Sequence, residues 1–521
     1  EFVFALPEDT AGQARMLRAR SFYLQALTEV LAWRVQLALD VPRDTLLFCA
    51  AGRFAIHAPD PPRDANERLA AERMFVEKWL LQNAAGSVRF SLAWHSAPRT
   101  TRLCEQYEAL LARLQREKAR PWASAAISAG MWHPNRLILE PSGELAQPER
   151  FQEIGKALPR ARWFVVTTAE APAVWGEIAS FPLPAFRGAL CSEAFDATRN
   201  PALLLANLHG RPDSIPASNV VHRPLARHVP LAPDGHPLLF EEIASRAVGP
   251  QYLGVLKMDA DSLGVAFQDR ARTAKDLKEL AIFSASLDNF FAVELDALLR
   301  TGPWQSIYTV FSGGDDLLLV GPWDLMLQFA GEVQTRFMAR FGDQGLTISG
   351  GLALVHYRHP IRRSAQLAED LLDRAKTEPA PRQQSGKNQL AALGQVWKWK
   401  DHTTVLATGK RVAGWVEDGW MERGWLHVLL DACLLPRRAT TERTRGDRML
   451  IEPRLTYHVT RNYPSPNDAK PERREVREWA DHVVAALKDG EQASDPETAF
   501  LPAILRYALL ATRSVPGEEV L

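Results

Sequence analysis

The sequence has few cysteines, no excess of charge of either sign and no long apolar run, and each absence excludes a class of protein. Its four cysteines lie far apart and none forms a Cys-x-x-Cys pair, which argues against a zinc ribbon or a disulfide framework. Lysine plus arginine and aspartate plus glutamate both number 62, which argues against a protein that binds nucleic acid over its whole surface. A local basic patch, or RNA binding through partner subunits, stays open. No segment approaches the roughly 18 apolar residues of a membrane span. We therefore expect a cytoplasmic protein with no zinc site and no membrane partner.

The clearest order in the chain begins near residue 251. The patterns predict a strand at Tyr252–Met258, a long helix, a hairpin, a further helix, strand and helix. The predicted later elements are a helix Ala274–Arg300, strands Ser306–Phe311 and Leu317–Gly321, a helix Pro322–Phe341 with Asp324 as N-cap, a strand Leu346–His356 and a helix Arg363–Lys376. The order β-α-β-β-α-β is that of the split βαβ, ferredoxin-like arrangement, which is the palm of many polymerases and cyclases.

An internal repeat predicts a second domain of this kind near the N-terminus. Residues Phe48–Pro59 align without gaps with residues Phe311–Pro322. In the first copy Gly52 and Arg53 stand where the second copy has Asp315 and Asp316. The first copy therefore lacks the acidic pair, and we expect one active palm and one scaffold palm. After the first hairpin we predict a helix at Asn66–Gln82 and a strand at Ser87–Trp94.

The expected fold class is α+β, with two palm domains, a connector between them and a helical C-terminal domain. The predicted boundaries are 1–120 for the first palm, 121–245 for the connector, 246–405 for the second palm and 406–521 for the helical domain.

The second palm carries the residues on which a phosphoryl-transfer centre depends. Asp315 and Asp316 lie at the tip of the predicted hairpin, and Asp259 ends the neighbouring apolar strand, with Asp261 two residues further on. Carboxylates at such a tip suit two Mg²⁺ ions (or Mn²⁺), which neutralise a triphosphate and activate an attacking hydroxyl. Gly313 and Gly314 permit close approach of a phosphate. The alternative is that Gly-Gly-Asp-Asp is a plain hairpin turn, since both residue types favour turns.

Basic residues follow the acidic ones. Lys376 ends the last predicted helix, and Lys387 lies in the loop Gly386-Lys387-Asn388. Either ammonium group suits the oxygens of a triphosphate, or else Lys376 simply interacts with the helix dipole on a solvated face. The basic segment Pro436–Glu475 is either a solvated helix face or a contact for RNA or a partner protein.

These motifs resemble those of the large, signalling subunit of type III CRISPR effector complexes, of the Csm and Cmr kinds. The matching segments are Leu256–Gly264, Ser312–Asp316, Ser349-Gly350-Gly351, Ala375-Lys376, Gly386-Lys387-Asn388, Pro453–His458 and Arg18–Phe22. Cyclases of the GGDEF kind share only the Gly-Gly-Asp hairpin and would not account for the degenerate first copy.

The resemblance implies an RNA-activated nucleotidyltransferase. On binding target RNA paired to the guide RNA, such a subunit converts ATP to cyclic oligoadenylates, within a complex that also contains backbone and small helical subunits. By motif position, the metal ligands would be Asp259, Asp315 and Asp316, with Asp261 as a further candidate, and the nucleotide-binding residues would be Ser312, Gly313, Gly314, Lys376, Lys387 and Asn388.

Two features of many family members are not found in this sequence: an HD nuclease domain and a four-cysteine zinc element between the palms. We therefore expect no DNase activity from this chain, and we expect that the full-length protein has residues upstream of Glu1. Three alternatives stay open, namely a stand-alone cyclase that makes cyclic dinucleotides, a non-catalytic scaffold of the ribonucleoprotein, and a palm that joins ATP to another small molecule.

Overall fold

The computed structural model describes most of the chain. The described residues are 2–3, 12–50, 52–84, 86–98, 101–128, 131–132, 148–192, 203–208, 220–222, 225–274, 277–381, 383–434, 451–463, 471–489 and 495–513. Much of the basic segment after Pro436 lies outside these residues. The chain divides into two compact units, which are Glu1–Val229 with Ser262–Thr301 and Thr309–Leu317, and Pro230–Asp261 with Gly302–Tyr308 and Leu318–Leu521.

The first unit combines long helices with short strands. Its helices are α1 (Gln13–Ala38), α2 (Ala65–Ala84), α3 (Leu103–Lys118), α4 (Ala123–Ala126), α5 (Pro148–Ala157), α7 (Leu263–Thr273), α8 (Leu277–Asn289) and α9 (Leu295–Leu299), with a 3₁₀ turn η1 (Arg43–Thr45) and a π-helical turn η4 (Phe290–Glu294). Its strands are β1 (Leu46–Ala50), β2 (Arg53–Ile56), β3 (Ile127–Ser128), β4 (Met131–Trp132), β5 (Trp163–Thr168), β6 (Glu177–Leu183), β7 (Phe186–Cys191), β8 (Leu204–Asn207) and β9 (Val220–His222).

The hairpin predicted in the first copy of the repeat is confirmed. Strands β1 and β2 pair antiparallel, with Ala50 opposite Arg53. The strands of the second copy are β11 (Tyr308–Gly313) and β12 (Asp316–Pro322), so both turns fall at the same aligned positions. The helix predicted at Asn66–Gln82 is also confirmed as α2. The strand predicted at Ser87–Trp94 is wrong, because this segment has no strand structure.

A five-stranded sheet follows, in the order β6-β7-β5-β8-β9. Strand β5 is buried over Trp163–Thr167, and helix α1 packs against this sheet through Phe22 and Tyr23. Phe22 meets Phe164 edge-on, with ring centroids 5.8 Å apart, and the Tyr23 hydroxyl donates to the carbonyl of Pro182 at 3.0 Å. Aromatic pairs of this geometry add to the hydrophobic gain of burial. Helix α1 and this sheet therefore share one core.

The second unit contains most of a six-stranded sheet and the C-terminal helices. Its strands are β10 (Tyr252–Ala260), β13 (Ile348–His356), β14 (Gln389–Ala392) and β15 (Gln395–Lys398), together with most of β12. Its helices are α6 (Phe240–Ala244), α10 (Trp323–Phe341), α11 (Ile361–Thr377), α12 (Trp399–Glu417), α13 (Arg423–Leu434), α15 (Ile451–Asn462), α16 (Pro471–Asp489), α17 (Pro496–Ala499) and α18 (Leu501–Ala511), with 3₁₀ turns η5 (Gly302–Ser306) and η6 (Gly342–Gln344).

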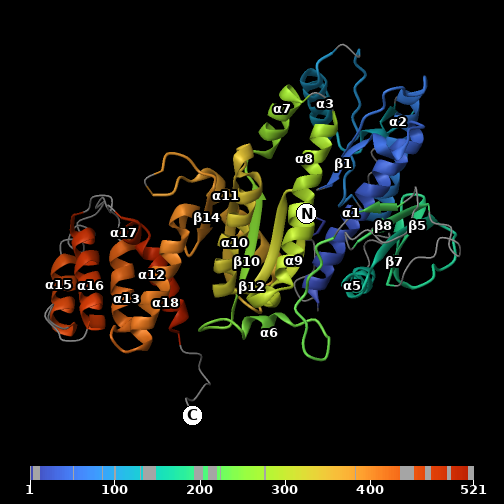
Figure 1. Cartoon of the computed structure of the whole chain (residues 1–521). Coiled ribbons are helices and arrows are strands. Elements are labelled where there is room, and N and C mark those ends of the chain that lie inside the picture. Colours follow the sequence, from blue (N-terminus) through green and yellow to red (C-terminus); the bar gives the residue numbers. More distant parts are fainter. Residues whose placement is uncertain are drawn as a thin grey trace. The chain divides into compact units, whose positions relative to one another are not determined.

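The sheet has the strand order β11-β12-β10-β13-β14-β15. Strands β10 and β13 pair antiparallel along nine residues each, and α10 and α11 pack against them (Figure 1). The predicted order β-α-β-β-α-β is confirmed for the segment from β10 to β13, and the mixed α+β class is confirmed for the chain. None of the helices in the described ranges is both long enough and apolar enough to span a bilayer.

The predicted N-cap of α10 is wrong. The helix begins at Trp323 after Pro322, and Asp324 lies within its first turn. The Asp324 carboxylate accepts a hydrogen bond from the backbone N–H of Val248 at 3.3 Å, and burial raises the pKa of this group. Tertiary contact has therefore replaced the local capping role.

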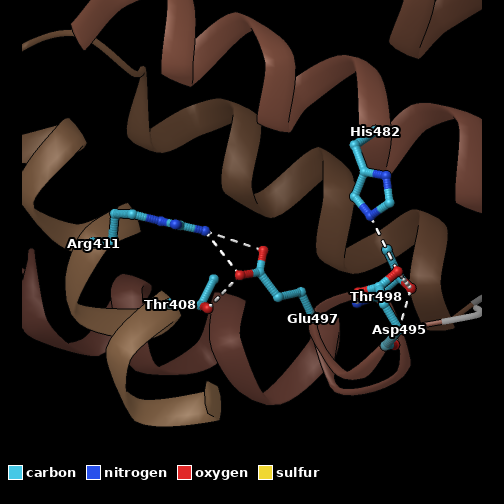
Figure 2. A network of polar contacts seen from close by, with 6 residues as sticks. All are labelled: Thr408, Arg411, His482, Asp495, Glu497 and Thr498. Atoms are coloured by element: carbon cyan, nitrogen blue, oxygen red, sulfur yellow. Dashed lines mark hydrogen bonds and ion pairs between the residues drawn. The ribbon is translucent and has the colours of Figure 1, made fainter. Parts of the chain in front are cut away.

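The C-terminal helices α12, α13 and α18 lie side by side, and α15 pairs with α16 (Figure 1). The short helix α17 is attached to α12 through Glu497, whose carboxylate accepts from Thr408 at 3.0 Å and from Arg411 at 2.9 Å (Figure 2). Asp495 caps α17, accepting the N–H of Thr498 at 3.1 Å. Satisfying an otherwise unpaired N–H group in this way fixes where the helix begins.

Helix α12 is joined to the sheet by the buried side chain of His402. The indole N–H of Trp397 donates to its Nδ1 at 3.1 Å, and its Nε2 lies 3.0 Å from the carbonyl of Leu327. Nδ1 is therefore an acceptor and Nε2 carries the proton, so the ring is neutral. Burial is the main reason that the pKa of His402 falls from 6.5 to about 4, and the Leu327 hydrogen bond opposes this fall.

The stability of the second unit is expected to depend on this histidine at acid pH. The unfolded chain takes up a proton near pH 6.5 and the folded chain only near pH 4, so stability is lost as the pH falls through that window. The loss is about 3 kcal/mol. Denaturant unfolding at several pH values, with His402→Gln as a non-titrating reference, measures it. Equal pH profiles for the two proteins would contradict the prediction.

Candidate active site

The C-terminal end of β10 presents Asp259. Strand β10 is apolar and largely buried, so it lies in the middle of the sheet, and its register sets Asp259 opposite Ser349 of β13. The Asp259 carboxylate is about one quarter exposed and forms an ion pair with Lys376, from the last turn of α11. A partly exposed carboxylate at a strand end is accessible to a cation. In this structure the ammonium group of Lys376 compensates its negative charge.

Asp261 is in a different environment. It is 4% exposed, and its carboxylate accepts hydrogen bonds from the hydroxyls of Thr347 and Ser349, each at 2.8 Å, and from the backbone N–H of Asn388 at 2.9 Å. Buried charges are stable only when they are paired or hydrogen-bonded, and here three protein donors meet that need. The carboxylate of Asp261 is therefore enclosed by protein donors, whereas the carboxylate of Asp259 is partly exposed to solvent.

The loop containing Lys387 and Asn388 lies against the end of α11. The backbone N–H of Lys387 donates to the carbonyl of Ala375 at 2.8 Å. A Cβ atom on Gly386 would come within 2.5 Å of the carbonyl oxygen of Lys376, so only glycine allows this approach. Lys387 and Asn388 both have a positive φ, of 66° and 50°. The structure therefore pairs Asp259 with Lys376 and places Lys387 and Asn388 in a loop against the turn of α11 that contains Lys376.

The hairpin Ser312–Asp316 is held by the helix that precedes it in the chain. The Ser312 hydroxyl donates to the carbonyl of Phe291 at 2.6 Å, and the N–H of Gly314 donates to the Asp288 carboxylate at 2.9 Å. Gly314 has a φ of 71°, in the left-handed region that favours glycine at this turn. Two contacts therefore set the hairpin on the helix.

The helix predicted over Ala274–Arg300 is interrupted where it meets this hairpin. Helix α8 ends at Asn289, and the π-helical turn η4 separates it from α9. A π turn displaces backbone carbonyls from their usual helical partners, and turns of this kind occur often at functional sites. The carbonyl of Phe291, within η4, is the group that accepts the Ser312 hydroxyl.

The predicted site residues fall into two sets. Asp259, Asp261, Lys376, Lys387 and Asn388 belong to the second unit, and the hairpin Ser312–Asp316 belongs to the first. Carboxylate oxygens are the ligand type that Mg²⁺ prefers, so both sets are of the right chemistry for it. In the part of the chain that the structure describes, no three His, Cys, Asp or Glu side chains are gathered as a metal site. The joining of Asp259 with Asp315 and Asp316 stays a prediction.

Two contacting residues were missed by the sequence prediction. Asp288 holds Gly314, and Lys398, at the end of β15, donates to the carbonyls of Ser385 and Gly386, each at 3.2 Å. No local pattern identifies either residue, because their partners are backbone groups distant in the sequence or across a strand pair.

Comparisons with known proteins identify the family. Residues 252–391 match the model of the Cas10/Cmr2 second palm domain, and residues 1–129 match Csm1 subunit domain B. The chain belongs to the Cas10/Csm1 family. The resemblance stated from the motifs is thereby confirmed, and the Cas10 match covers the Asp259, hairpin and Lys376 motifs.

Curated relatives of the chain include Csm1 proteins of type III-A CRISPR systems and a Cmr2 subunit. It is 28% identical over 437 residues to the single-strand-specific deoxyribonuclease Cas10/Csm1 of Thermococcus onnurineus (strain NA1), covering 74% of this chain and 52% of that protein. The Csm1 protein of Mycobacterium tuberculosis (strain ATCC 25618 / H37Rv) is 25% identical, with 75% and 52% covered. The chain thus spans about half the length of these curated relatives.

Solved structures of Csm1 share the fold. A Csm1–Csm4 cassette in complex with AMPPNP superposes with a TM-score of 0.71 at 22% identity, covering 96% of this chain and 67% of that one. The same cassette in complex with cA4 gives a TM-score of 0.69 at 21% identity, with the same coverage. At this level of identity the similarity establishes the fold.

Proposed function

We propose that this Cas10/Csm1 chain is the signalling subunit of a type III CRISPR effector complex and converts ATP to cyclic oligoadenylates when target RNA binds. The observation that carries the proposal is the pairing of a partly exposed Asp259 with Lys376 inside the segment that matches the Cas10 second palm. A carboxylate for a metal ion and an ammonium group for a phosphate lie at one edge of the sheet, as nucleotidyl transfer requires.

The sheet topology supports the joining of Asp259 with the hairpin aspartates. Strand β13 is antiparallel to β10, which lies between β12 and β13 in the strand order. Strands β12 and β13 are connected by helix α10, and such helical crossovers join parallel strands. We infer that β12 runs antiparallel to β10 and begins at the edge where β10 ends. Asp315 and Asp316 would then share that edge with Asp259.

The roles of the residues follow from this arrangement. Asp259, Asp315 and Asp316 would hold two Mg²⁺ or Mn²⁺ ions, which when bound neutralise the triphosphate and activate the attacking hydroxyl. Ser312, Gly313 and Gly314 would lie against the nucleotide, where the missing side chains of the glycines allow close approach. Lys376, released from Asp259, and Lys387 would bind phosphate oxygens as point charges, with Asn388 beside them.

Membership of the family also suggests where this chain acts and with which partners. We propose that the chain works in the cytoplasm with guide RNA, target RNA and the backbone and small helical subunits of its complex. The related cassettes contain Csm4 with AMPPNP or with cA4, which agrees with ATP as substrate and a cyclic oligoadenylate as product. We further propose that the β1–β2 hairpin belongs to a first, metal-free palm, because its turn aligns with that of β11–β12.

The proposal is tested by assembling the complex with guide RNA, ATP and Mg²⁺, with or without target RNA, and resolving the products by mass spectrometry. Cyclic oligoadenylate that requires target RNA and is lost in Asp315→Ala/Asp316→Ala supports it. Arg53→Ala, at the position aligned with Asp316 in the first hairpin, is the matched control and should retain activity. Product formed equally without target RNA indicates a stand-alone cyclase, and no product at all indicates a scaffold.

A further inference from the structure

The loop Ser385–Asn388 contains Lys387 and lies against the last turn of α11, which contains Lys376; these are the two lysines proposed to bind phosphate. It follows α11, which ends one residue after Lys376, and leads directly into β14. The N–H of Lys387 donates to Ala375 in the last turn of α11, and Gly386 packs against the carbonyl of Lys376. The position of Lys387 relative to Lys376 therefore depends on what holds this loop.

Lys398 holds one side of the loop. It is the last residue of β15, and the antiparallel pairing with β14 sets it opposite Gln389, the residue after the loop. Its ammonium group donates to three successive carbonyls, at 3.2 Å to Ser385, 3.2 Å to Gly386 and 2.5 Å to Lys387. An ammonium group has three donors, so these carbonyls use its full capacity. Burial lowers the pKa of Lys398, and the charge of Asp261 opposes this shift.

Asp261 holds the other side. Its buried carboxylate accepts the N–H of Asn388, and the hydroxyls of Thr347 and Ser349 attach the same carboxylate to β13 and the residue before it. Lys387 and Asn388 both have a positive φ, which residues other than glycine rarely adopt. Such a conformation persists only where surrounding contacts determine it, and the carboxylate and the ammonium group supply those contacts.

The loop also contains a buried acceptor without a partner among the described residues, which is the side-chain oxygen of Asn388. Buried acceptors in folded proteins are nearly always paired, so a donor from a bound molecule or a water is expected there. The Asn388 oxygen is therefore the atom of this loop to which a nucleotide amine, or a water, would donate.

We propose that Asp261 and Lys398 are positioning residues for nucleotide binding, which together fix the loop Ser385–Asn388 so that Lys387 and Asn388 face the nucleotide. This inference rests on the proposed function and deepens it. It gives Asp261 a role different from the metal ligand expected from the sequence, because its oxygens are already engaged by protein donors.

Two titrations of the full chain separate the roles. In the first, ATP is titrated in EDTA, and in the second, Mn²⁺ is titrated alone. Asp261→Asn and Lys398→Met are each expected to weaken ATP binding by roughly tenfold, which is the effect of losing one hydrogen bond to a charged group. Both variants should keep an Mn²⁺ affinity within about twofold of the wild type. Lys398→Arg keeps the charge and several donors and should restore most of the ATP affinity.

Lys400→Met is the matched control. Lys400 is exposed, and its replacement removes the same charge two residues away from Lys398. Thermal unfolding of each variant checks its fold. If Asp261→Asn does not fold, the comparison of Lys398→Met with Lys398→Arg still tests the proposal. Loss of Mn²⁺ binding in Asp261→Asn would overturn the inference by making this residue a metal ligand. So would ATP affinity in both variants equal to that of the wild type. A wild-type chain that binds ATP neither in EDTA nor with Mg²⁺ present would instead contradict the proposed function itself.

Discussion

Replacing Asp259 with asparagine is expected to lower the rate of cyclic oligoadenylate synthesis by roughly 1,000-fold, or about 4 kcal/mol of transition-state stabilisation. The substitution keeps the size of the side chain and removes its charge. The proposed metal ions would lose a ligand at the end of β10, and Lys376 would lose the carboxylate with which it pairs. The rate is measured on the assembled complex with target RNA, by chromatography of the products.

A suitable control is Asp373→Asn, on the same helix as Lys376. Asp373 is exposed, so its replacement removes an equal charge from the neighbourhood without touching the strand end. It should change the rate by less than about twofold, as expected for an exposed charge. A rate for Asp259→Asn within a few-fold of the wild type would contradict the assignment of Asp259 to the catalytic centre.

Replacing Gly351 with alanine is expected to destabilise the second unit by about 3 kcal/mol or more. Strand β13 and helix α11 meet at this glycine, and an added Cβ would come within 2.3 Å of both the carbonyl oxygen of Ala368 and the backbone nitrogen of Leu372. Backbone atoms within a helix cannot turn aside as a flexible side chain can, so the helix itself must move. Chemical denaturation monitored by circular dichroism measures the loss.

The neighbouring glycine provides the control for this prediction. A Cβ atom on Gly350 would meet the side chains of Leu390 and Met258, at 3.0 and 3.3 Å, and side chains of this kind can shift by the small amount required. Gly350→Ala should therefore cost clearly less than Gly351→Ala. Equal losses would show that the close approach of backbone to backbone is not what requires the glycine.

The Gly351 prediction also links stability to the site. Helix α11 carries Lys376, and the loop after it carries Lys387. A helix pushed outward from β13 would move both ammonium groups away from Asp259. A variant that remains folded in the cold but binds ATP poorly would reveal this link.

Much of the palm could be predicted because its signals are local. The apolar run Tyr252–Met258 marks β10, and the turn Gly314-Asp315 between two apolar segments marks the β11–β12 hairpin. The alignment of the two hairpins depends only on residue types at fixed offsets, and the strand ends agree with it. Predictions failed where a local pattern competed with distant contacts. Ser87–Trp94 has strand-like composition but no strand structure, and Asp324 was drawn into a contact with Val248 in place of a cap.

The sequence alone identified the family and predicted the chemical type of the site, because both inferences depend on which residues occur at which spacing. The motifs around Asp259, Ser312–Asp316 and Lys376 were sufficient to name the family that the comparisons confirm. The sequence offered both Asp259 and Asp261 as possible metal ligands, and only the tertiary structure showed how different their environments are. Two residues beyond Asp259, the chain meets the hydroxyls of β13 and the N–H of Asn388, so one carboxylate is enclosed and the other remains partly exposed. Environments of this kind come from residues nearly a hundred or more positions away, and no local pattern encodes them.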